Sequence, residues 1–265
     1  MKRTIAALAV LAFLAGSASA QGLEITNVRP SYGPAGATRK EKKLMAGDAL
    51  WVNFDIDGLK ADPKFGKLIY QTTMELFDAN KKLKFSDKKG GGELIPDLGG
   101  SRAPSDFHVV PGEKFDPGKY TVRLTVTDKV SGDKKTIDYP VEIVPSEFGI
   151  YGVVALGIGI RAQNYVLSFG VAQFKLKDKK PNVEVNIRIL DSNDKPVGKP
   201  MQMNLPQALP DGVDVEKVQF APFTYPMFLN RTGQFTIEIT ATDRNASNKS
   251  AKLSFPLSVL EPGSK

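Results

Sequence analysis

The side chains that usually carry out enzymatic chemistry are scarce in this chain. Its 265 residues include no cysteine and a single histidine, His108, in the run Asp106-Phe-His-Val-Val110. Nucleophilic catalysis with a histidine base would have to use His108, and neither a cysteine nor a Gly-x-Ser-x-Gly motif accompanies it. We therefore interpret His108 as a solvent-facing strand residue, with a lone general base as the alternative, and predict no catalytic residue. Zinc and copper sites built from histidine and cysteine are excluded by the same inventory.

Carboxylates are the remaining candidates for metal or acid–base chemistry. The run Asp55-Ile-Asp57-Gly58, followed by Asp62, resembles a calcium loop, but its glycine is fourth, whereas an EF-hand needs glycine in the sixth position. Other polar residues recur in matched sets, namely Asp78 and Asn80, Asp191, Asn193 and Asp194, and Asp128 and Asp243. Because Asp and Asn favour β-turns, we interpret these sets as turn residues, with oxygen-ligand calcium sites as the alternative. We predict neither a metal ion nor a cofactor.

Lysine-rich segments are candidates for binding rather than catalysis. Convergent lysines would attract an acidic polysaccharide or another envelope polymer, whereas the interpretation that we favour is a solvated face. Nucleic acid is not an expected partner, because the lysines are not interleaved with stacking aromatic residues. The two sets proposed as a binding surface are Lys81, Lys82, Lys84, Lys88 and Lys89, and Lys175, Lys177, Lys179 and Lys180; a third basic set is Arg39, Lys40, Lys42 and Lys43.

A second candidate surface is the aromatic and proline-rich run from Phe220 to Phe228. Exposed, its side chains Phe220, Phe223, Tyr225 and Phe228 would stack on sugars or dock an envelope protein. Buried, they would form an inter-sheet corner or a seam between domains, which we favour because large exposed apolar patches are rare on monomers.

The segments expected to form the strands that position these residues occur twice along the chain. The stretch Pro117–Asp128 returns as Thr232–Asp243, displaced by 115 positions. Further pairs keep the same order, namely Leu50–Ile56 with Tyr165–Val171, Met74–Asn80 with Ile187–Asn193, and Tyr139–Ile143 with Phe255–Val259. Their apolar and polar residues alternate, which is typical of half-buried strands. We therefore predict an all-β chain of two tandem antiparallel β-sandwich domains, at residues 21–145 and 146–265.

Proline indicates where one of these strands lies. Pro140 and Pro256 occupy matching positions in the last strand of each copy. Because proline cannot donate a hydrogen bond to a neighbouring strand, we expect that strand at a sheet edge or at a bulge.

The segment Gly118-Lys-Tyr-Thr-Val-Arg-Leu-Thr-Val-Thr-Asp128 resembles the penultimate strand of immunoglobulin-like domains of the PKD and bacterial Ig-like type. In that family the glycine precedes an aromatic residue that packs at a corner. The resemblance implies a tandem immunoglobulin-like fold. It also implies a tyrosine-corner hydrogen bond at Tyr120, whereas Phe235 in the second copy has no hydroxyl to form one.

The N-terminal residues predict export. Lys2 and Arg3 precede a short apolar run, and Ala18-Ser-Ala20 is a small-residue cleavage site, so we expect residues 1–20 to be a cleaved signal peptide. The apolar run is too short to span a membrane, and we expect no transmembrane segment in the mature chain. The formal net charge of +7 falls by two when Lys2 and Arg3 are removed.

These features favour an exported, non-enzymatic binding protein of the periplasm or the extracellular space. Two alternatives stay open: a carbohydrate-active hydrolase that uses carboxylates alone, and a structural spacer in an envelope assembly. A hydrolase would need two carboxylates at a set separation across a cleft.

Overall fold

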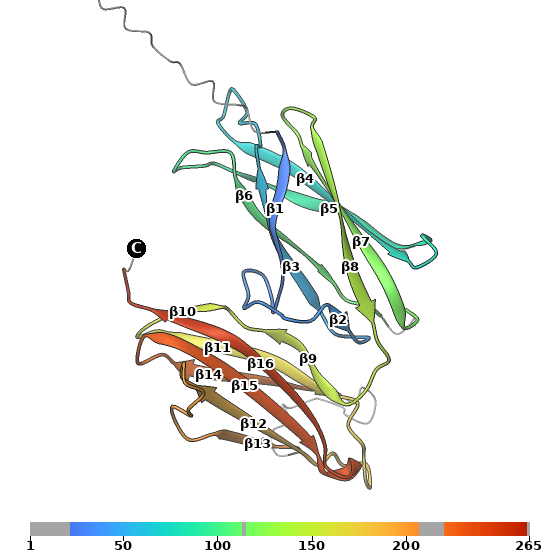
Figure 1. Cartoon of the computed structure of the whole chain (residues 1–265), viewed down its shortest axis with the longest axis vertical. Coiled ribbons are helices and arrows are strands. Elements are labelled where there is room, and N and C mark those ends of the chain that lie inside the picture. The colour runs from blue at the N-terminus through green and yellow to red at the C-terminus, as the bar shows by residue number, and fades with distance from the viewer. Residues whose placement is uncertain (1–21, 113–114, 207–219, 264–265) are drawn as a thin grey trace, which may run out of the picture.

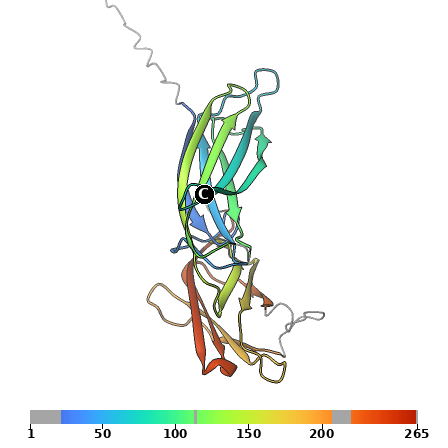
Figure 2. The same ribbon diagram turned by 90° about the vertical axis from the view of Figure 1, so that its right-hand side faces the viewer.

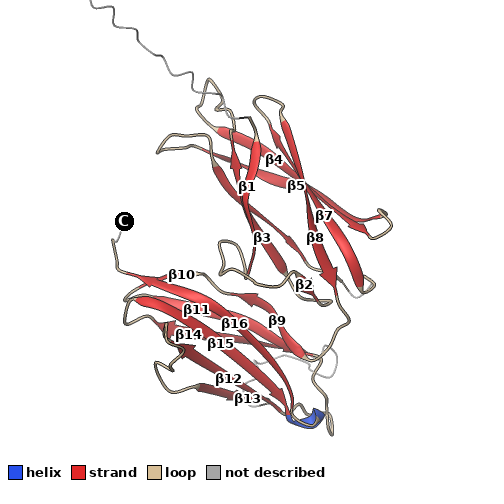
Figure 3. Ribbon diagram, in the orientation of Figure 1, coloured by secondary structure: helices blue, strands red, loops and turns tan. Residues whose placement is uncertain are grey.

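The described chain is all-β, as expected. The computed structural model describes residues 22–112, 115–206 and 220–263, apart from the side chain of Lys89. The predicted signal peptide lies outside these residues. Four sheets group into two pairs (Figure 1), which we call the N-terminal sandwich (β1 to β8) and the C-terminal sandwich (β9 to β16). Figure 2 shows them stacked along the long axis of the molecule, and Figure 3 distinguishes the strands from the short 3-10 helix near the C-terminus.

The N-terminal sandwich packs a three-stranded sheet against a five-stranded sheet. The smaller sheet has the order β1 (Glu24–Ser31), β3 (Leu50–Asp57), β6 (Ala103–Val109). The larger has the order β2 (Lys43–Leu44), β8 (Lys134–Ile143), β7 (Gly118–Asp128), β4 (Leu68–Asp78), β5 (Leu83–Leu94).

The C-terminal sandwich has the same strand order. Its smaller sheet runs β9 (Gly149–Val154), β11 (Asn164–Ala172), β14 (Phe220–Phe228). The larger runs β10 (Ile158–Ile160), β16 (Lys249–Leu260), β15 (Gly233–Asp243), β12 (Val183–Leu190), β13 (Met201–Asn204), and the 3-10 helix η1 (Arg244–Ala246) links β15 to β16. Among the described residues, no helix is long and apolar enough to cross a membrane.

Alternation along the central strands explains the two cores. In β7, Tyr120, Val122, Leu124 and Val126 are buried, while the residues between them are partly or fully exposed. Successive side chains of a strand point to opposite faces of the sheet, so this pattern directs one face of β7 into the core. In β15, Phe235, Ile237, Ile239 and Ala241 are also buried, and on the opposite face Glu238 is buried by its ion pairs with Arg188 and Lys252.

The two matching prolines lie at sheet edges, as predicted. Strand β2 pairs only with Glu142 and Ile143 of β8, so β8 has one neighbour at Pro140. Strand β10 pairs with β16 only from Ser258 onward, so Pro256 is also at an open edge. The missing N–H of each proline therefore leaves no ladder hydrogen bond unmade.

Candidate binding surfaces

Two buried carboxylates each fix a basic loop in place. Asp128 and Asp243 end β7 and β15 with their side chains turned inward, at 1% and 0% exposure. Asp128 Oδ2 accepts the backbone N–H of Lys60 at 2.9 Å, and Asp243 Oδ2 accepts that of Lys175 at 2.7 Å. In both cases the donor lies 68 residues earlier in the chain. These residues lie next to turns, as predicted, but the anchoring of a distant loop is a role that we did not predict.

Hydrogen bonds keep the Asp128 carboxylate ionised despite its burial. Burial alone would raise its pKa, but the backbone N–H groups of Lys60 and Val130 and the hydroxyl of Ser131 donate to it and outweigh this effect. The pKa of Asp128 therefore lies below its usual value.

The basic loop of the C-terminal sandwich, which we define as residues 175–180, is held by a second side chain. The side-chain amide of Asn245, in η1, donates to the carbonyl oxygens of Lys175 and Lys180 at 3.0 Å each. Lys177 and Lys180 exchange backbone hydrogen bonds of 3.0 Å across the turn. The exposed side chains of Lys175, Lys177, Lys179 and Lys180 are thus carried by a backbone of defined shape.

A polar pocket of about 980 Å³ opens beside this loop. We call it the amide pocket, because the amides of Asn182, Gln202, Asn204 and Asn245 line it, together with Lys177, Lys180 and the carboxylate of Asp178. Within the described residues, the side-chain amides of Asn182, Gln202 and Asn204 make no hydrogen bond. Unpaired amides beside two lysines offer donors and acceptors for hydroxyl groups and donors for anions.

The lysines of the N-terminal sandwich lie elsewhere. Lys81 and Lys82 form the turn between β4 and β5, and Lys84 and Lys88 belong to the edge strand β5. Lys84 Nζ lies 3.6 Å from Asp78 Oδ2, and the Lys89 side chain is outside the described residues. The first set therefore lies on β5 and the turn before it, and the second lies between β11 and β12, in different sandwiches (Figure 1).

The matched acidic sets at Asp78 and Asp191 form turns with the same hydrogen bonds. Asp78 Oδ1 accepts the N–H groups of Asn80 and Lys82 at 2.9 and 3.0 Å, and Asp191 Oδ1 accepts those of Asn193 and Lys195 at the same distances. These are Asx-type turns, as the prediction of turn residues implies. The backbone N–H of Lys82 is the largest influence that holds the pKa of Asp78 below its usual value.

The aromatic run forms edge strand β14, and its side chains alternate in burial. Phe223 is buried and its ring stacks on Phe169 with centroids 5.2 Å apart. Phe220 and Tyr225 are partly buried, and Phe228 is 63% exposed. The Phe220 ring lies against Gly170, where a Cβ atom would come within 2.2 Å of it. The run thus splits between an apolar inner face and an outer face, rather than forming one exposed patch.

His108 lies in β6 and is exposed, as its interpretation as a solvent-facing strand residue requires. Its ring stacks on Trp51 of the neighbouring strand β3, with centroids 4.4 Å apart. Among the described residues, no group of three or more His, Asp or Glu side chains is placed to hold a metal ion.

The joint between the sandwiches is built from the loop that follows β1. Tyr32 and Ala37, at 6% and 2% exposure, are part of the core of the C-terminal sandwich. The N–H of Ala37 donates to the carbonyl of Ala155 at 2.8 Å, and the N–H of Ala155 donates to the carbonyl of Tyr32 at 2.9 Å. The Tyr32 ring also packs 5.4 Å from Phe255, and burial raises the pKa of Tyr32 to about 12. We use "the joint" for these residues together with the cluster described next.

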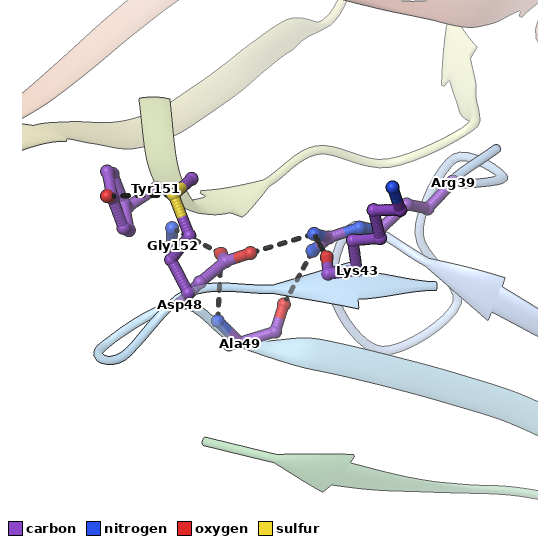
Figure 4. Close-up of polar contacts among 7 residues, drawn as sticks. Arg39, Lys43, Asp48, Ala49, Tyr151 and Gly152 are labelled. Atoms are coloured by element: carbon purple, nitrogen blue, oxygen red, sulfur yellow. Dashed lines mark hydrogen bonds and ion pairs between the residues drawn. The ribbon is translucent and has the colours of Figure 1, made fainter. Parts of the chain in front are cut away.

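A buried ion pair reinforces the joint (Figure 4). Asp48, at 4% exposure, accepts Arg39 Nη2 at 2.8 Å and the backbone N–H of Gly152 at 3.1 Å, through different carboxylate oxygens. The hydroxyl of Tyr151 contacts Met45 Sδ at 3.1 Å. Both sandwiches contribute to this cluster, because Asp48 and Met45 precede β3 while Tyr151 and Gly152 are in β9. The contacts hold the two sandwiches in one arrangement.

Comparison with known proteins adds little to this description. No family model matches the chain, and no curated protein matches it. Among solved structures, the chain is similar to red sea bream transglutaminase, with 9% identity over 91% of this chain and 31% of that one, at a TM-score of 0.28. It is also similar to dimeric latent PorU from Porphyromonas gingivalis, with 11% identity over 93% of this chain and 21% of that one, at a TM-score of 0.39. The chain thus spans less than a third of either protein, and neither likeness bears on its activity.

Proposed function

We propose that this chain is an exported, non-enzymatic binding protein of two immunoglobulin-like domains, and that its amide pocket takes an acidic polysaccharide. Three features support the immunoglobulin-like part. The two sandwiches share a strand order. The carboxylates of Asp128 and Asp243 each accept a backbone N–H from a residue 68 positions earlier in the chain. The Tyr120 hydroxyl donates to the Asp116 carbonyl at 2.8 Å. This last bond is the tyrosine corner of such folds. The signal-like N-terminus supports export.

The observation that carries the binding proposal is the fixed shape of the basic loop. Asp243 accepts one hydrogen bond from the backbone N–H of Lys175, and Asn245 donates two, to the carbonyls of Lys175 and Lys180. Binding to a pre-ordered loop costs less conformational entropy than binding to a flexible one. The lysines would pair with carboxylate or sulfate groups, and the neighbouring amides would bond sugar hydroxyls.

A titration with polygalacturonate, and with uncharged dextran as the comparison polymer, tests this proposal. We expect polygalacturonate to bind at low salt and to weaken as salt rises, because exposed charge pairs are screened. The double variant Lys177→Gln/Lys180→Gln should weaken binding by roughly tenfold, as expected if each lost ion pair contributes about 0.7 kcal/mol. Lys81→Gln/Lys82→Gln makes the same change in net charge on the other sandwich and is the matched control. An equal loss in both double variants would show that net charge alone binds the polymer and would contradict a site at the amide pocket.

The joint favours a second candidate function, a structural spacer. A spacer needs its two domains held in one orientation, which the buried Arg39–Asp48 pair and the Ala37–Ala155 backbone bonds provide. A spacer would bind neither polymer in the titration above. The carboxylate-dependent hydrolase stays a prediction.

A further inference from the structure

A second pocket, of about 360 Å³, lies in the N-terminal sandwich between β6 and the sheet that ends in β5. We call it the apolar pocket, because most of its lining is apolar, including Met74, Leu76, Phe85, Phe107, Phe115 and Leu124. Its volume is within the range of small-molecule sites, which are mostly apolar with a few polar groups.

The unequal width of the two sheets explains why this pocket exists. The larger sheet ends in β5, whereas the smaller sheet ends in β6 and has no further strand to cover the inner face of β5. Phe85 is on that inner face, because it pairs with the buried Leu76 of β4. Phe85 is nevertheless 46% exposed. A large aromatic side chain on the core side of a strand, left half in water, marks the place where a ligand would bury apolar surface.

Two contacts limit the pocket. The Tyr70 hydroxyl reaches from β4 to Ser105 Oγ of β6 at 3.4 Å and connects the two sheets beside the pocket. Phe115 lines the pocket and packs against Tyr120, with ring centroids 6.1 Å apart. The space is therefore a bounded pocket suited to a small molecule rather than an open groove for an added strand.

The charge of the lining selects the kind of ligand. The lining includes two carboxylates, Asp87 and Asp106, and neither lysine nor arginine. Asp106 is exposed to solvent, and within the described residues its carboxylate has no hydrogen bond and no ion pair. Partial burial raises its pKa, and the neighbouring His108 opposes that effect. A cationic group beside Asp106 would form a partly exposed charge pair at the mouth of the pocket.

We infer that the apolar pocket binds a small apolar amine, with its hydrocarbon part against Phe85 and Met74 and its ammonium group beside Asp106. This site is on the N-terminal sandwich and does not depend on polysaccharide binding at the amide pocket. Either site can therefore fail without affecting the other.

The chain contains its own reporter for this site. Trp51 is the only tryptophan in the sequence, and it stacks on His108, which lines the pocket. The test is a titration of the full chain with phenethylamine, followed by Trp51 fluorescence and by ligand-observed saturation-transfer NMR. The uncharged 2-phenylethanol and the anionic 3-phenylpropanoate have the same ring and serve as comparison probes. We expect phenethylamine to bind most tightly and 3-phenylpropanoate least.

Two variants locate the binding. Asp106→Asn should weaken phenethylamine by roughly fivefold, the scale of a partly exposed charge pair, and leave 2-phenylethanol unchanged. Phe85→Ala should weaken both probes by roughly tenfold, because it removes an aromatic wall. Asp133→Asn, in the exposed β7–β8 turn, makes the same change in charge as Asp106→Asn and should have no effect. Absence of binding by NMR, or equal binding of all three probes, would overturn the inference.

Discussion

The N-terminal and C-terminal sandwiches share a strand order but differ in what completes their cores. The N-terminal core contains only residues between Leu23 and Ile143. The C-terminal core contains Tyr32 and Ala37 as well as residues of its own strands. Burial of these two side chains removes apolar surface from water that the C-terminal sandwich would otherwise expose. Within the described residues, the second sandwich therefore takes two core residues from a loop of the first, whereas the first takes no core residue from the second.

The edges of the two sandwiches differ as well. Edge strand β5 has 12 residues and no proline, whereas its counterpart β13 has four. Edge strand β14 carries Pro222 and Pro226, which cannot donate to an added strand. Strand β5 is instead interrupted by register shifts and carries lysines, a second way in which proteins protect an edge. The smaller sheet leaves the inner face of the long strand β5 uncovered, and residues of β5 line the apolar pocket. A difference in strand length between the two sandwiches therefore yields a difference in possible ligands.

The largest expected effect comes from breaking the shared core. Tyr32→Ala should destabilise the C-terminal sandwich by about 3 kcal/mol, the usual cost of removing a buried aromatic ring, while the N-terminal sandwich changes little. Amide hydrogen exchange followed by mass spectrometry measures this region by region, through β15 and β16 against β7 and β8. Tyr139→Ala removes a tyrosine of equal exposure from the N-terminal core and is the matched control. Faster exchange in β7 and β8 of Tyr32→Ala would show that the dependence is mutual.

The next effect concerns the two anchoring carboxylates. Asp128→Asn should cost about 3 kcal/mol and Asp243→Asn about 2 kcal/mol, because buried N–H groups lose a charged acceptor in each case. The difference follows from the bonds accepted, since Asp128 also accepts the Ser131 hydroxyl. Urea unfolding followed by Trp51 fluorescence measures the loss in the N-terminal sandwich and should change only for Asp128→Asn. Amide hydrogen exchange in β15 and β16 measures the loss that Asp243→Asn causes in the C-terminal sandwich. A larger loss from Asp243→Asn would contradict this ranking.

The pH dependence of Asp128 gives an independent check on the same carboxylate. Its folded pKa lies below the usual value of 3.8, so its hydrogen bonds stabilise the folded state above about pH 4. That stabilisation is lost as the pH falls through the lowered, folded pKa. Trp51 fluorescence should therefore show acid destabilisation of the unaltered protein that is smaller in Asp128→Asn.

More of the fold than of the candidate sites could be predicted from the sequence. Period-2 alternation and the repeated segments predicted an all-β chain, and the inability of proline to donate predicted the edges at Pro140 and Pro256. The anchoring role of Asp128 was also within reach of the sequence. It follows Tyr120, Val122, Leu124 and Val126 on one face of a strand, so the period places its carboxylate toward the core. We interpreted it from its turn chemistry alone.

The joint could not be predicted in the same way. Tyr32 lies in the run Ser31-Tyr-Gly-Pro34, whose residues favour a turn and carry no information on which core the ring enters. That choice depends on how the second sandwich folds back after residue 145, which involves residues more than 100 positions away. The apolar pocket has the same origin, because it results from the lateral extent of two sheets and not from any local pattern.

The smallest expected effect concerns the corner residue that distinguishes the two copies. Tyr120→Phe removes the hydroxyl that donates to the Asp116 carbonyl at 2.8 Å and should destabilise the N-terminal sandwich by about 1 kcal/mol. Phe235 holds the matching position, is buried at 8% exposure and lies under the Arg231 guanidinium at 5.2 Å. If the corners have the same geometry, the hydroxyl of Phe235→Tyr would face the backbone carbonyl of Arg231, which is four residues upstream as Asp116 is from Tyr120. We expect this exchange to stabilise the C-terminal sandwich by up to about 1 kcal/mol, measured by hydrogen exchange in β15. A loss of stability in Phe235→Tyr would show that Arg231 has replaced the tyrosine corner by a cation–π contact, and that the two copies differ at this corner as they differ at the joint.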